Sequence, residues 1–388
     1  MAKLIDITGK SLSGEWGTDD ETGDGIPVLR TTNFTNEGVV NYNDVVTRTI
    51  TKKNIADKFL RKGDIIIEKS GGSDKFPVGR VIYFDGEEKT YLFNNFTGLL
   101  RVKNQDDWYP KYIFYSLYAN YKRGGTRAFE NKTTGLHNLK TDDYVSRYEV
   151  AEIDKTEQIL ICEKLNKLYE IIKLRRQELQ LLDELIKARF VEMFGDPVYN
   201  TNDLPIRNLN ELGNWASGGT PSRTVPEYFK GNIDWYSAGE LNTLFLEGSV
   251  EKITEEAIEK SATKLFKAGS LLIGMYDTAA FKMGILKEDS ASNQACACIT
   301  PNDEVNIIWL YYELQMMKEH FLSQRRGVRQ KNLNLGMIKA FKIPIAKREQ
   351  QDEFSDFVKQ VDKSKVAIQA ALDKSQLLFD SLMQKYFG

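Results

Sequence analysis

The alternation of apolar and polar residues between Asp154 and Gly195 predicts one long helix. Apolar residues follow one another at alternating steps of four and three, with arginine at the two remaining seam positions, 175 and 189. The apolar members are Ile161, Leu165, Leu168, Ile172, Leu179, Leu182, Ile186 and Met193. About 40 helical residues would be roughly 60 Å long. A seam of this length requires a partner helix, and the alternative is an amphipathic helix packed on its own domain.

The segment from Lys347 to Gly388 repeats the pattern and is the predicted partner. Its apolar positions again alternate by three and four, with polar breaks at 364, 375 and 385. They are Phe354, Phe357, Val361, Ile368, Ala371, Leu378 and Leu382. We expect the two helices to pair as an antiparallel coiled coil.

The two helical segments also begin and end alike. Residues 153–158 (IDKTEQ) resemble residues 345–350 (IAKREQ), and Phe-Gly closes both segments. The offset is 192 residues from Ile153 to Ile345 and 193 from Gly195 to Gly388. A repeat of about half the chain predicts two similar halves.

Short apolar runs between glycine-rich turns precede each helix in the same order. In the first half these runs are Pro27–Arg30, Asp64–Glu68, Val78–Phe84, Thr97–Val102 and a helical Tyr112–Tyr121; in the second they include Asn232–Tyr236, Gly269–Ile273 and Trp309–Tyr312. We therefore predict an α+β chain of two mixed α/β globules, 1–150 and 196–345. Two long helices, 151–195 and 346–388, separate them with pseudo-twofold symmetry.

Composition narrows the class of protein. A chain of 388 residues with ordinary hydrophobic content can hold two or three domains, and its longest apolar runs fall far short of a membrane span. The first ten residues lack the apolar core of a signal peptide. Three cysteines, at 162, 296 and 298, predict reduced thiols and a cytoplasmic protein. The net charge of −2 requires any nucleic-acid surface to be local.

Catalytic patterns are weak. The two histidines, His137 and His320, lack metal-ligand spacing with Cys or carboxylates, and no Walker or GxGxxG loop occurs. Asp64 with Glu68 and Lys69 is faintly like a nuclease cluster, but the spacing is wrong. The run Asp196–Tyr199 is similar to an amino-methyltransferase motif without its cofactor loop, and a helix-terminating proline explains it better.

Binding features are stronger, because each globule ends in a basic, polar stretch. These stretches are Tyr121–Arg127 with Lys132–Asn138 in the first half and Ser323–Asn332 in the second. Arg and Lys beside glycine suit phosphate, and Arg, Gln and Asn can read base edges. The loop Ser217–Arg223 offers backbone N–H groups and hydroxyls for phosphate as well. The alternatives are a solvated charged surface and a plain turn.

Two sets of residues resemble a known family. Ser217–Ser222 (SGGTPS) followed by Ile233–Trp235 is similar to the start of a target-recognition domain, and Gln330–Asn334 leading to Ile343–Ile345 is similar to its end. Together they resemble, over the whole chain, the specificity (S) subunit of type I restriction–modification systems. The first half departs from the pattern, with Ser11–Gly17 in place of the SGGTPS loop.

The resemblance implies a non-catalytic subunit in which each globule, as a target-recognition domain, reads one half of a bipartite DNA target. It also implies that the helices set the spacing and dock two methyltransferase (M) subunits. Those subunits would bring S-adenosylmethionine, and restriction (R) subunits would use ATP and Mg²⁺. No cofactor is expected on this chain.

We predict DNA contacts from basic, amide and hydroxyl side chains of both globules. They are Arg30, Asn33, Lys69, Arg80, Arg123, Arg127, Lys132 and Asn138, with Thr220, Ser222, Arg223, Tyr236, Lys282, Arg325, Arg326, Arg329, Gln330 and Lys331. The predicted partner-binding residues are Tyr169, Leu174, Leu181 and Leu185 on the first long helix. Two alternatives remain: a protein-only coiled-coil scaffold, and a stand-alone DNA methyltransferase or nuclease.

Overall fold

The computed structural model of the chain describes residues 1–133, 136–323 and 332–388. Its internal contacts divide the chain into two compact units. Unit 1 contains Met1–Arg175 and Ala371–Gly388, and unit 2 contains Arg176–Ala370. Each long helix, α4 (Lys155–Phe194) and α9 (Arg348–Phe387), therefore contributes one half to each unit.

Unit 1 is organised around an antiparallel sheet in the order β2-β10-β6-β8, formed by β2 (Leu12–Ser13), β10 (Thr97–Leu100), β6 (Ile65–Glu68) and β8 (Val81–Tyr83). A second sheet has the order β3-β5-β4-β9, with a parallel β4–β9 pair; its strands are β3 (Thr18–Asp19), β5 (Val46–Thr49), β4 (Ile26–Leu29) and β9 (Leu92–Phe93). Smaller pairings join β1 (Ala2–Lys3) to β13 (Glu149–Val150), and β11 (Glu130–Thr133) and β7 (Ser70–Gly72) to β12 (Leu136–Leu139).

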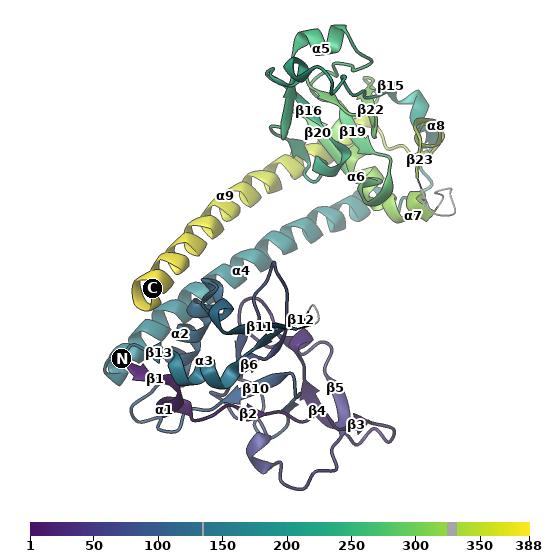
Figure 1. Cartoon of the computed structure of the whole chain (residues 1–388). Coiled ribbons are helices and arrows are strands. Elements are labelled where there is room, and N and C mark those ends of the chain that lie inside the picture. The colour runs from purple at the N-terminus through teal and green to yellow at the C-terminus, as the bar shows by residue number, and fades with distance from the viewer. Residues whose placement is uncertain (134–135, 324–331) are drawn as a thin grey trace. The chain divides into compact units, whose positions relative to one another are not determined.

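The central strand β6 explains why helices cover the main sheet of unit 1. Its three consecutive isoleucines, Ile65 to Ile67, are all fully buried, although neighbouring residues of a strand point to opposite faces. Both faces must therefore be covered, and α2 packs on β8 (Figure 1). The helices of this unit are α1 (Leu4–Thr8), α2 (Pro110–Lys122), α3 (Thr141–Arg147) and the halves of α4 and α9.

Unit 2 repeats this organisation. Its main sheet has the order β15-β22-β19-β20-β17, formed by β15 (Gly213–Ser217), β22 (Cys296–Pro301), β19 (Leu271–Gly274), β20 (Met283–Leu286) and β17 (Phe245–Leu246). A second sheet, β18-β16-β21, contains β18 (Glu251–Ile253), β16 (Ile233–Tyr236) and β21 (Ala291–Ser292), and β14 (Ile206–Asn208) pairs with β23 (Lys342–Pro344). The short helices are α5 (Glu255–Glu259), α6 (Ile307–Met316), α7 (Lys318–Ser323) and α8 (Leu335–Lys339).

The two units share one topology, which confirms the predicted repeat. The pairings β2–β10–β6–β8 and β15–β22–β19–β20 are antiparallel in both, and β4–β9 and β16–β21 are both parallel. The central strand β19 is again buried on both faces. Packing of α6 on β20 matches that of α2 on β8.

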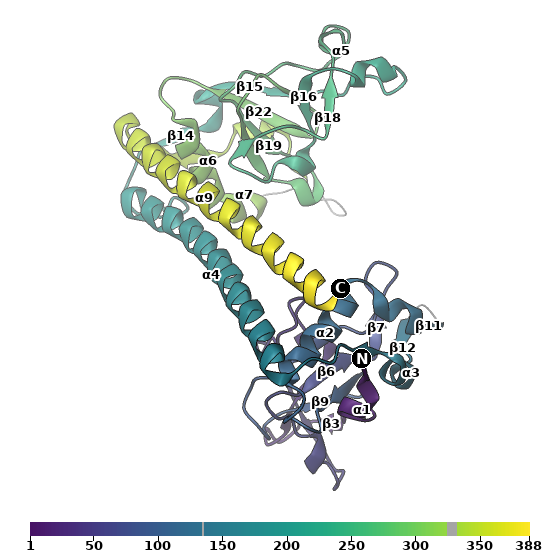
Figure 2. The same ribbon diagram turned by 90° about the vertical axis from the view of Figure 1, so that its left-hand side faces the viewer.

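In each unit a half of α4 lies beside a half of α9 (Figures 1 and 2). All eight predicted apolar seam residues of α4 are buried or half-buried. In unit 2 Asp183 pairs with Lys365 at 2.6 Å and Arg189 with Glu353 at 2.9 Å, so these halves run antiparallel. In unit 1 Arg175 contacts the Ala371 carbonyl and the Ser375 hydroxyl.

The seam of α9 departs from the predicted positions near its end. The predicted positions Ile368 and Ala371 are half-buried and position 375 is buried, so the heptad holds to this point. Beyond it Phe379 and Met383 are buried, whereas Leu378 is 49% exposed. The predicted seam residue Leu378 was therefore wrong by one residue.

Two buried glutamines show the repeat at the level of single atoms. Gln158 accepts the Tyr109 N–H at 2.8 Å, while its amide donates to the carbonyls of Asp107 and Ile153 at 3.0 Å. Gln351 makes the same three bonds in unit 2, to Asn306 N–H at 2.7 Å and to the carbonyls of Glu304 and Ala346 at 3.3 and 2.8 Å. The true offset at the helix start is therefore 193 residues, and the predicted offset of 192, which matched Gln158 with the exposed Gln350, was wrong.

Candidate nucleic-acid interface

The glycine turn after β15 is a packed element of unit 2. A Cβ on Gly218 would lie 2.3 Å from the Ser292 carbonyl oxygen, and one on Gly219 would lie 2.5 Å from that of Ala262, so both positions require glycine. Their N–H groups donate to the carbonyls of Cys296 at 3.1 Å and Ser292 at 2.9 Å. These two amides are already used inside the fold, so phosphate binding by the loop Ser217–Arg223 would fall to its other N–H groups and hydroxyls and stays a prediction.

The side chains beyond this turn are exposed, and they include three predicted DNA contacts. Thr220 donates to Gln294 Oε1, and Ser222 shares a hydrogen bond of 2.7 Å with Thr224. Arg223 is held by both carboxylate oxygens of Glu251, with Nη2 2.7 Å from Oε2. The hydrogen bond from Arg223 also lowers the pKa of Glu251.

Two aromatic rings fix the plane of the Arg223 guanidinium. It lies 4.2 Å from the ring centre of Phe229 and 5.3 Å from that of Trp235, while its side chain stays 54% exposed. A planar group held by stacking and by a bidentate pair has little rotational freedom left to lose on binding. Among the predicted residues described here, Arg223 is thus a pre-organised cation at the surface.

Unit 1 has a corresponding turn that the sequence did not reveal. A Cβ on Gly14 would meet the carbonyl oxygens of Phe93 and Asn94 at 2.1 and 2.2 Å, as one on Gly218 would meet the carbonyls of Ser292 and Asn293. Beside it, Arg48 lies 4.2 Å from the Trp16 ring centre and pairs with Asp19. The signal was present in the shared Ser-Gly dipeptide, 13–14 and 217–218.

Three predicted residues of unit 1 support the fold around β4. Asn33 is buried, and its amide donates to the carbonyls of Asn41 and Asp44 at 3.0 and 2.9 Å. Arg80 donates to the carbonyls of Phe34 and Thr31 at 2.8 and 2.9 Å and approaches Glu68 at 3.3 Å. Arg30 pairs with Asp44 at 3.0 Å.

The remaining predicted residues of unit 1 are more accessible. Arg123 is exposed just beyond α2, and Arg127, also exposed, donates to the Asp74 carbonyl at 3.2 Å. Lys69 donates to Ser13 at 3.2 Å, and partial burial lowers its pKa. Asn138 is half-buried on the hairpin β11–β12, whose backbone also includes Lys132; the side chain of Lys132 is outside what the structure describes.

In unit 2, Tyr236 is buried and its hydroxyl donates to Asp234 at 3.4 Å, while Lys282 reaches the Gly239 carbonyl at 3.4 Å. Five further predicted contacts lie outside the described residues: Arg325, Arg326, Arg329, Gln330 and Lys331. The structure therefore brings the accessible candidates to the loops of each unit. All of these DNA contacts stay predictions.

Three of the four predicted partner-binding residues, Leu174, Leu181 and Leu185, form an exposed apolar stripe on α4. Leu174, Leu181 and Leu185 are 59, 61 and 47% exposed, and Tyr169 is half-buried. Ile171 is 40% exposed and lies on the same face of α4, because residues 171, 174, 181 and 185 are separated by three, seven and four residues. A water-exposed row of leucines on a helix is typical of a protein-binding surface.

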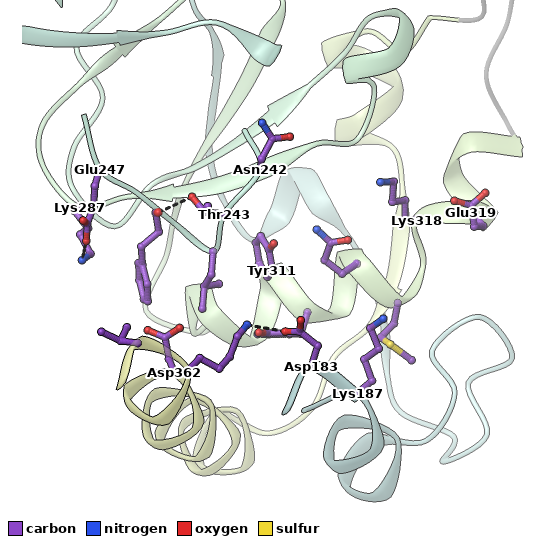
Figure 3. A pocket seen from close by; sticks show the side chains of 17 residues that line it. Asp183, Lys187, Asn242, Thr243, Glu247, Lys287, Tyr311, Lys318, Glu319 and Asp362 are labelled. Carbon is purple, nitrogen blue, oxygen red and sulfur yellow. Dashed lines mark hydrogen bonds and ion pairs between the residues drawn. The ribbon is translucent and has the colours of Figure 1, made fainter. Parts of the chain in front are cut away.

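A cavity of about 730 Å³ lies in unit 2, between the loop 242–247, α6 and the helix halves (Figure 3). Figure 3 shows lysine and carboxylate side chains alternating around it, including the ion pair between Lys365 and Asp183. Four lysines and four carboxylates line it: Lys187, Lys287, Lys318, Lys365, Asp183, Glu247, Glu319 and Asp362. Because these charges balance, the cavity does not suit the polyanionic backbone of a nucleic acid.

Within the described ranges, no cluster of three His, Cys, Asp or Glu side chains is close enough to bind a metal ion. No helix in the described part of the chain has the length and apolar character needed to cross a membrane. Cys162, Cys296 and Cys298 are buried free thiols, and burial raises the pKa of each to about 12.

Known proteins that are similar in sequence to this chain come from type I restriction–modification systems. Residues 202–376 match the model of the type I restriction modification DNA specificity domain. The chain is 24% identical over 170 residues to the Escherichia coli type I restriction enzyme EcoR124I/EcoR124II specificity subunit, covering 42% of each protein. It is 25% identical over 165 residues to the Methanocaldococcus jannaschii MjaIX specificity subunit, covering 41% of this chain and 38% of that protein. The matched segment spans less than half the length of either relative.

Solved structures extend the likeness in fold to the full chain. The type I restriction–modification S subunit from M. genitalium superposes with a TM-score of 0.60 at 16% identity, covering 100% of this chain and 95% of that one. A structure concerned with complex assembly and conformational transition of the type I R-M system gives 0.58 at 16% identity, covering 100% and 96%. Residues 202–376 thus match the DNA specificity domain of type I restriction–modification systems, and the whole chain has the duplicated fold of the solved S subunit from M. genitalium.

Proposed function

We propose that this chain gives a type I restriction–modification complex its DNA sequence specificity, with each globule reading one half of a bipartite target. One observation carries the proposal: two units of the same strand pairing follow each other in one chain, each with exposed polar loops. Two copies of one reading fold with different loop residues suit a target made of two different half-sites.

The proposed DNA contacts are the predicted side chains of both halves. In the described residues the most accessible are Arg123, Arg127, Thr220, Ser222 and Arg223. Arginines can read guanine or hold phosphate, and the hydroxyls can accept or donate at either. The chain has a net charge of −2 and no overall positive charge to attract DNA, so further affinity for the phosphate backbone would come from partner subunits.

The long helices provide the spacer and the docking surface in this proposal. Forty uninterrupted helical residues in each of α4 and α9 suit a rigid separation between half-sites. Two methyltransferase subunits would bind the exposed stripe of α4, bring S-adenosylmethionine and extrude the target adenine. Restriction subunits would add ATP- and Mg²⁺-dependent cleavage. The division into segments 1–150, 151–195, 196–345 and 346–388, and a cytoplasmic location, belong to the same proposal.

Methylome sequencing of cells with and without the chain tests this function. We expect a split adenine motif to be methylated only when the chain is present together with its methyltransferase subunits. An identical set of methylated motifs in both cell lines would contradict the proposal and favour a protein-only scaffold.

A second measurement addresses the alternative of a stand-alone enzyme. The purified chain is mixed with DNA and either S-adenosylmethionine or Mg²⁺. We expect no methyl transfer and no cleavage until the methyltransferase and restriction subunits are added. Turnover by the chain alone would contradict the assignment as a non-catalytic subunit.

A further inference from the structure

One hairpin loop of the main sheet carries an exposed aromatic ring in both units. The loop between β6 and β8 presents Phe76, which is 57% exposed, and the loop between β19 and β20 presents Tyr276, which is 38% exposed. The strands that bear these loops are equivalent in the repeat. The two rings lie at different positions in these loops, since Phe76 is eight residues beyond the end of β6 and Tyr276 two residues beyond the end of β19. Exposed rings in the equivalent loops of both halves still need an explanation beyond the core of either unit.

The base of the loop in unit 1 is fixed by two backbone hydrogen bonds. The N–H of Lys69 donates to the carbonyl of Phe96 at 2.8 Å, and the carbonyl of Lys69 accepts from the N–H of Leu139 at 2.8 Å. Leu139 directly follows the basic stretch Lys132–Asn138. The base of the loop is therefore bonded to the residue next to that stretch.

The base of the loop in unit 2 is built in the same way. The N–H of Met275 donates to the carbonyl of Ala295 at 2.9 Å, and its carbonyl accepts from the N–H of Leu333 at 2.9 Å. Leu333 directly follows the basic stretch of residues 323–332. The same two bonds thus fix the base of an aromatic loop in both halves, although the loop sequences differ.

The tip of the unit 1 loop is held in one conformation. The Ser73 N–H donates to the Phe76 carbonyl at 2.7 Å, and the Phe76 N–H donates to the Ser73 hydroxyl at 3.1 Å. Arg127 donates to the carbonyls of Asp74 at 3.2 Å and Lys75 at 3.4 Å. The Lys75 ammonium lies 5.2 Å from the Phe76 ring centre. The ring is therefore presented on an anchored turn, with a cation beside it.

Unit 1 has another exposed ring near this loop, Phe96, which is 55% exposed. Its equivalent in unit 2 is Ala295, since both carbonyls accept the same backbone bond. The hairpin loops, in contrast, carry an aromatic residue in both units. In unit 1 the ring has the Lys75 ammonium beside it, and Arg127 is bonded to its turn. Such a ring can bind a nucleobase by stacking while the cations hold the phosphates.

We propose that Phe76 and Tyr276 stack on a DNA base, one in each half-site, where the duplex is opened or kinked. This inference rests on the proposed function and names the chemistry of the same surface. Stacking accepts any base, so the two rings add affinity without selecting one base. The affinity that they add depends on how easily the bases of each half-site unstack. Base reading by hydrogen bonds is left to the neighbouring polar residues.

The test uses the full chain assembled with its methyltransferase subunits, and a duplex carrying the split target found by methylation mapping. 2-Aminopurine replaces one base at a time in each half-site, and the methylated adenine is left unsubstituted because its own extrusion would give a signal. The variants are Phe76→Ala, Tyr276→Ala and Tyr276→Phe. Tyr199→Ala is the control, since Tyr199 is 80% exposed and lies outside both loops.

We expect each alanine variant to bind about 5- to 150-fold more weakly and to lose the fluorescence change in one half-site only. Tyr276→Phe keeps the ring and should retain both affinity and signal, as should Tyr199→Ala. Unchanged affinity and fluorescence in both alanine variants would overturn this proposal while the proposed function stands. Loss of assembly with the methyltransferase subunits would also overturn it, because the rings would then contact protein. A wild-type complex without target preference would overturn the proposed function and this inference with it.

Discussion

At the scale of single residues, the twin glutamines carry much of the attachment of each long helix to its globule. Each is buried and satisfies one backbone N–H and two carbonyls at the start of a helix. A buried N–H that loses its acceptor costs about 1–3 kcal/mol. The glutamines therefore lock the first turn of α4 and α9 to the segment before α2 and α6.

We expect Gln158→Ala to destabilise unit 1 by about 2–3 kcal/mol and Gln351→Ala to do the same in unit 2. Faster hydrogen exchange at the amides of Tyr109 and Asn306, respectively, would measure the effect within each unit. Gln350→Ala is the matched control, because Gln350 is exposed, and a surface change of this kind stays within about 0.5 kcal/mol. Equal effects of all three substitutions would contradict the structural alignment of the repeat.

Glu313 is a buried carboxyl group, and neither of its oxygens has a hydrogen-bond partner among the residues that the structure describes. In unit 1 the equivalent residue is Ser116, whose hydroxyl lies 2.8 Å from that of Tyr148. Phe341 takes the place of Tyr148 in unit 2, since each gives its carbonyl to the equivalent N–H of Leu4 or Leu209. With no hydroxyl to meet it, burial raises the pKa of Glu313 well above its ordinary value.

The raised pKa gives a pH dependence of known sign. Above about pH 4.5 the unfolded state has released this proton, whereas the folded state still holds it. The free energy of unfolding therefore falls as pH rises towards the pKa of Glu313 in the folded state. We expect Glu313→Met to be more stable than wild type by about 1–3 kcal/mol near pH 7, and the difference to shrink towards pH 4. Urea unfolding at several pH values measures it. The same shift in Glu319→Gln, an exposed control, would contradict this cause.

Sequence could not separate buried polar residues from exposed ones within the loops. Asn33, Arg80 and Arg223 were indistinguishable as polar residues in glycine-rich segments. The structure uses the first two to bind backbone carbonyls and leaves the third 54% exposed. The difference depends on segments far apart in the chain, such as Arg80 reaching Thr31, which no local pattern records.

At the scale of elements, periodicity predicted the long helices well, because a buried seam must repeat every turn. The boundaries of α4 and α9 lie within a residue or two of the segments predicted from the heptads. Strands such as β6 and β19 were predicted from their apolar runs. The place of Phe379 in the seam of α9 was missed, because Leu377, Leu378 and Phe379 are all apolar and only packing selects Phe379.

The exposed stripe of α4 leads to a prediction about assembly. We expect the double variant Leu181→Glu/Leu185→Glu to fold normally, because both side chains are about half exposed or more. It should bind the methyltransferase subunits at least about tenfold more weakly, since two desolvated leucines contribute more than about 1.4 kcal/mol. Titration calorimetry or co-purification measures this.

Glu184→Gln is the control for that experiment, as Glu184 is exposed on the same turn of α4 outside the stripe. Normal assembly of the double variant would show that methyltransferase subunits bind elsewhere. Weakened assembly of the control as well would indicate a general charge effect.

At the scale of the whole molecule, the repeat makes the two proposed reading domains separable. Arg223 belongs to unit 2, as do Glu251, Phe229 and Trp235, which hold its side chain. We expect Arg223→Gln to relax the motif at one half-site by about 1–3 kcal/mol and to leave the other half-site unchanged. Methylome sequencing of cells carrying the variant reads both half-sites at once.

Arg207→Gln provides the matched control, because Arg207 also pairs with glutamates at the surface of unit 2 but lies on β14, away from the loops. It should leave the motif unchanged. Relaxation of both half-sites by Arg223→Gln would contradict independent reading by the two halves.

The last helix also has a consequence for how the protein is made. Phe387 lies 5.2 Å from Tyr112, as Phe194 lies 6.1 Å from Trp309, so the final turn of α9 completes the packing around α2. Unit 1 includes residues 371–388, which a ribosome delivers only after the whole of unit 2 has emerged. During synthesis Tyr112 and Tyr115 of unit 1 lack their contact with the end of α9 until the last residues are made. In unit 2, by contrast, the α4 half is made before the rest of the unit. The nascent chain is therefore most open to chaperones and proteases at the end that was translated first.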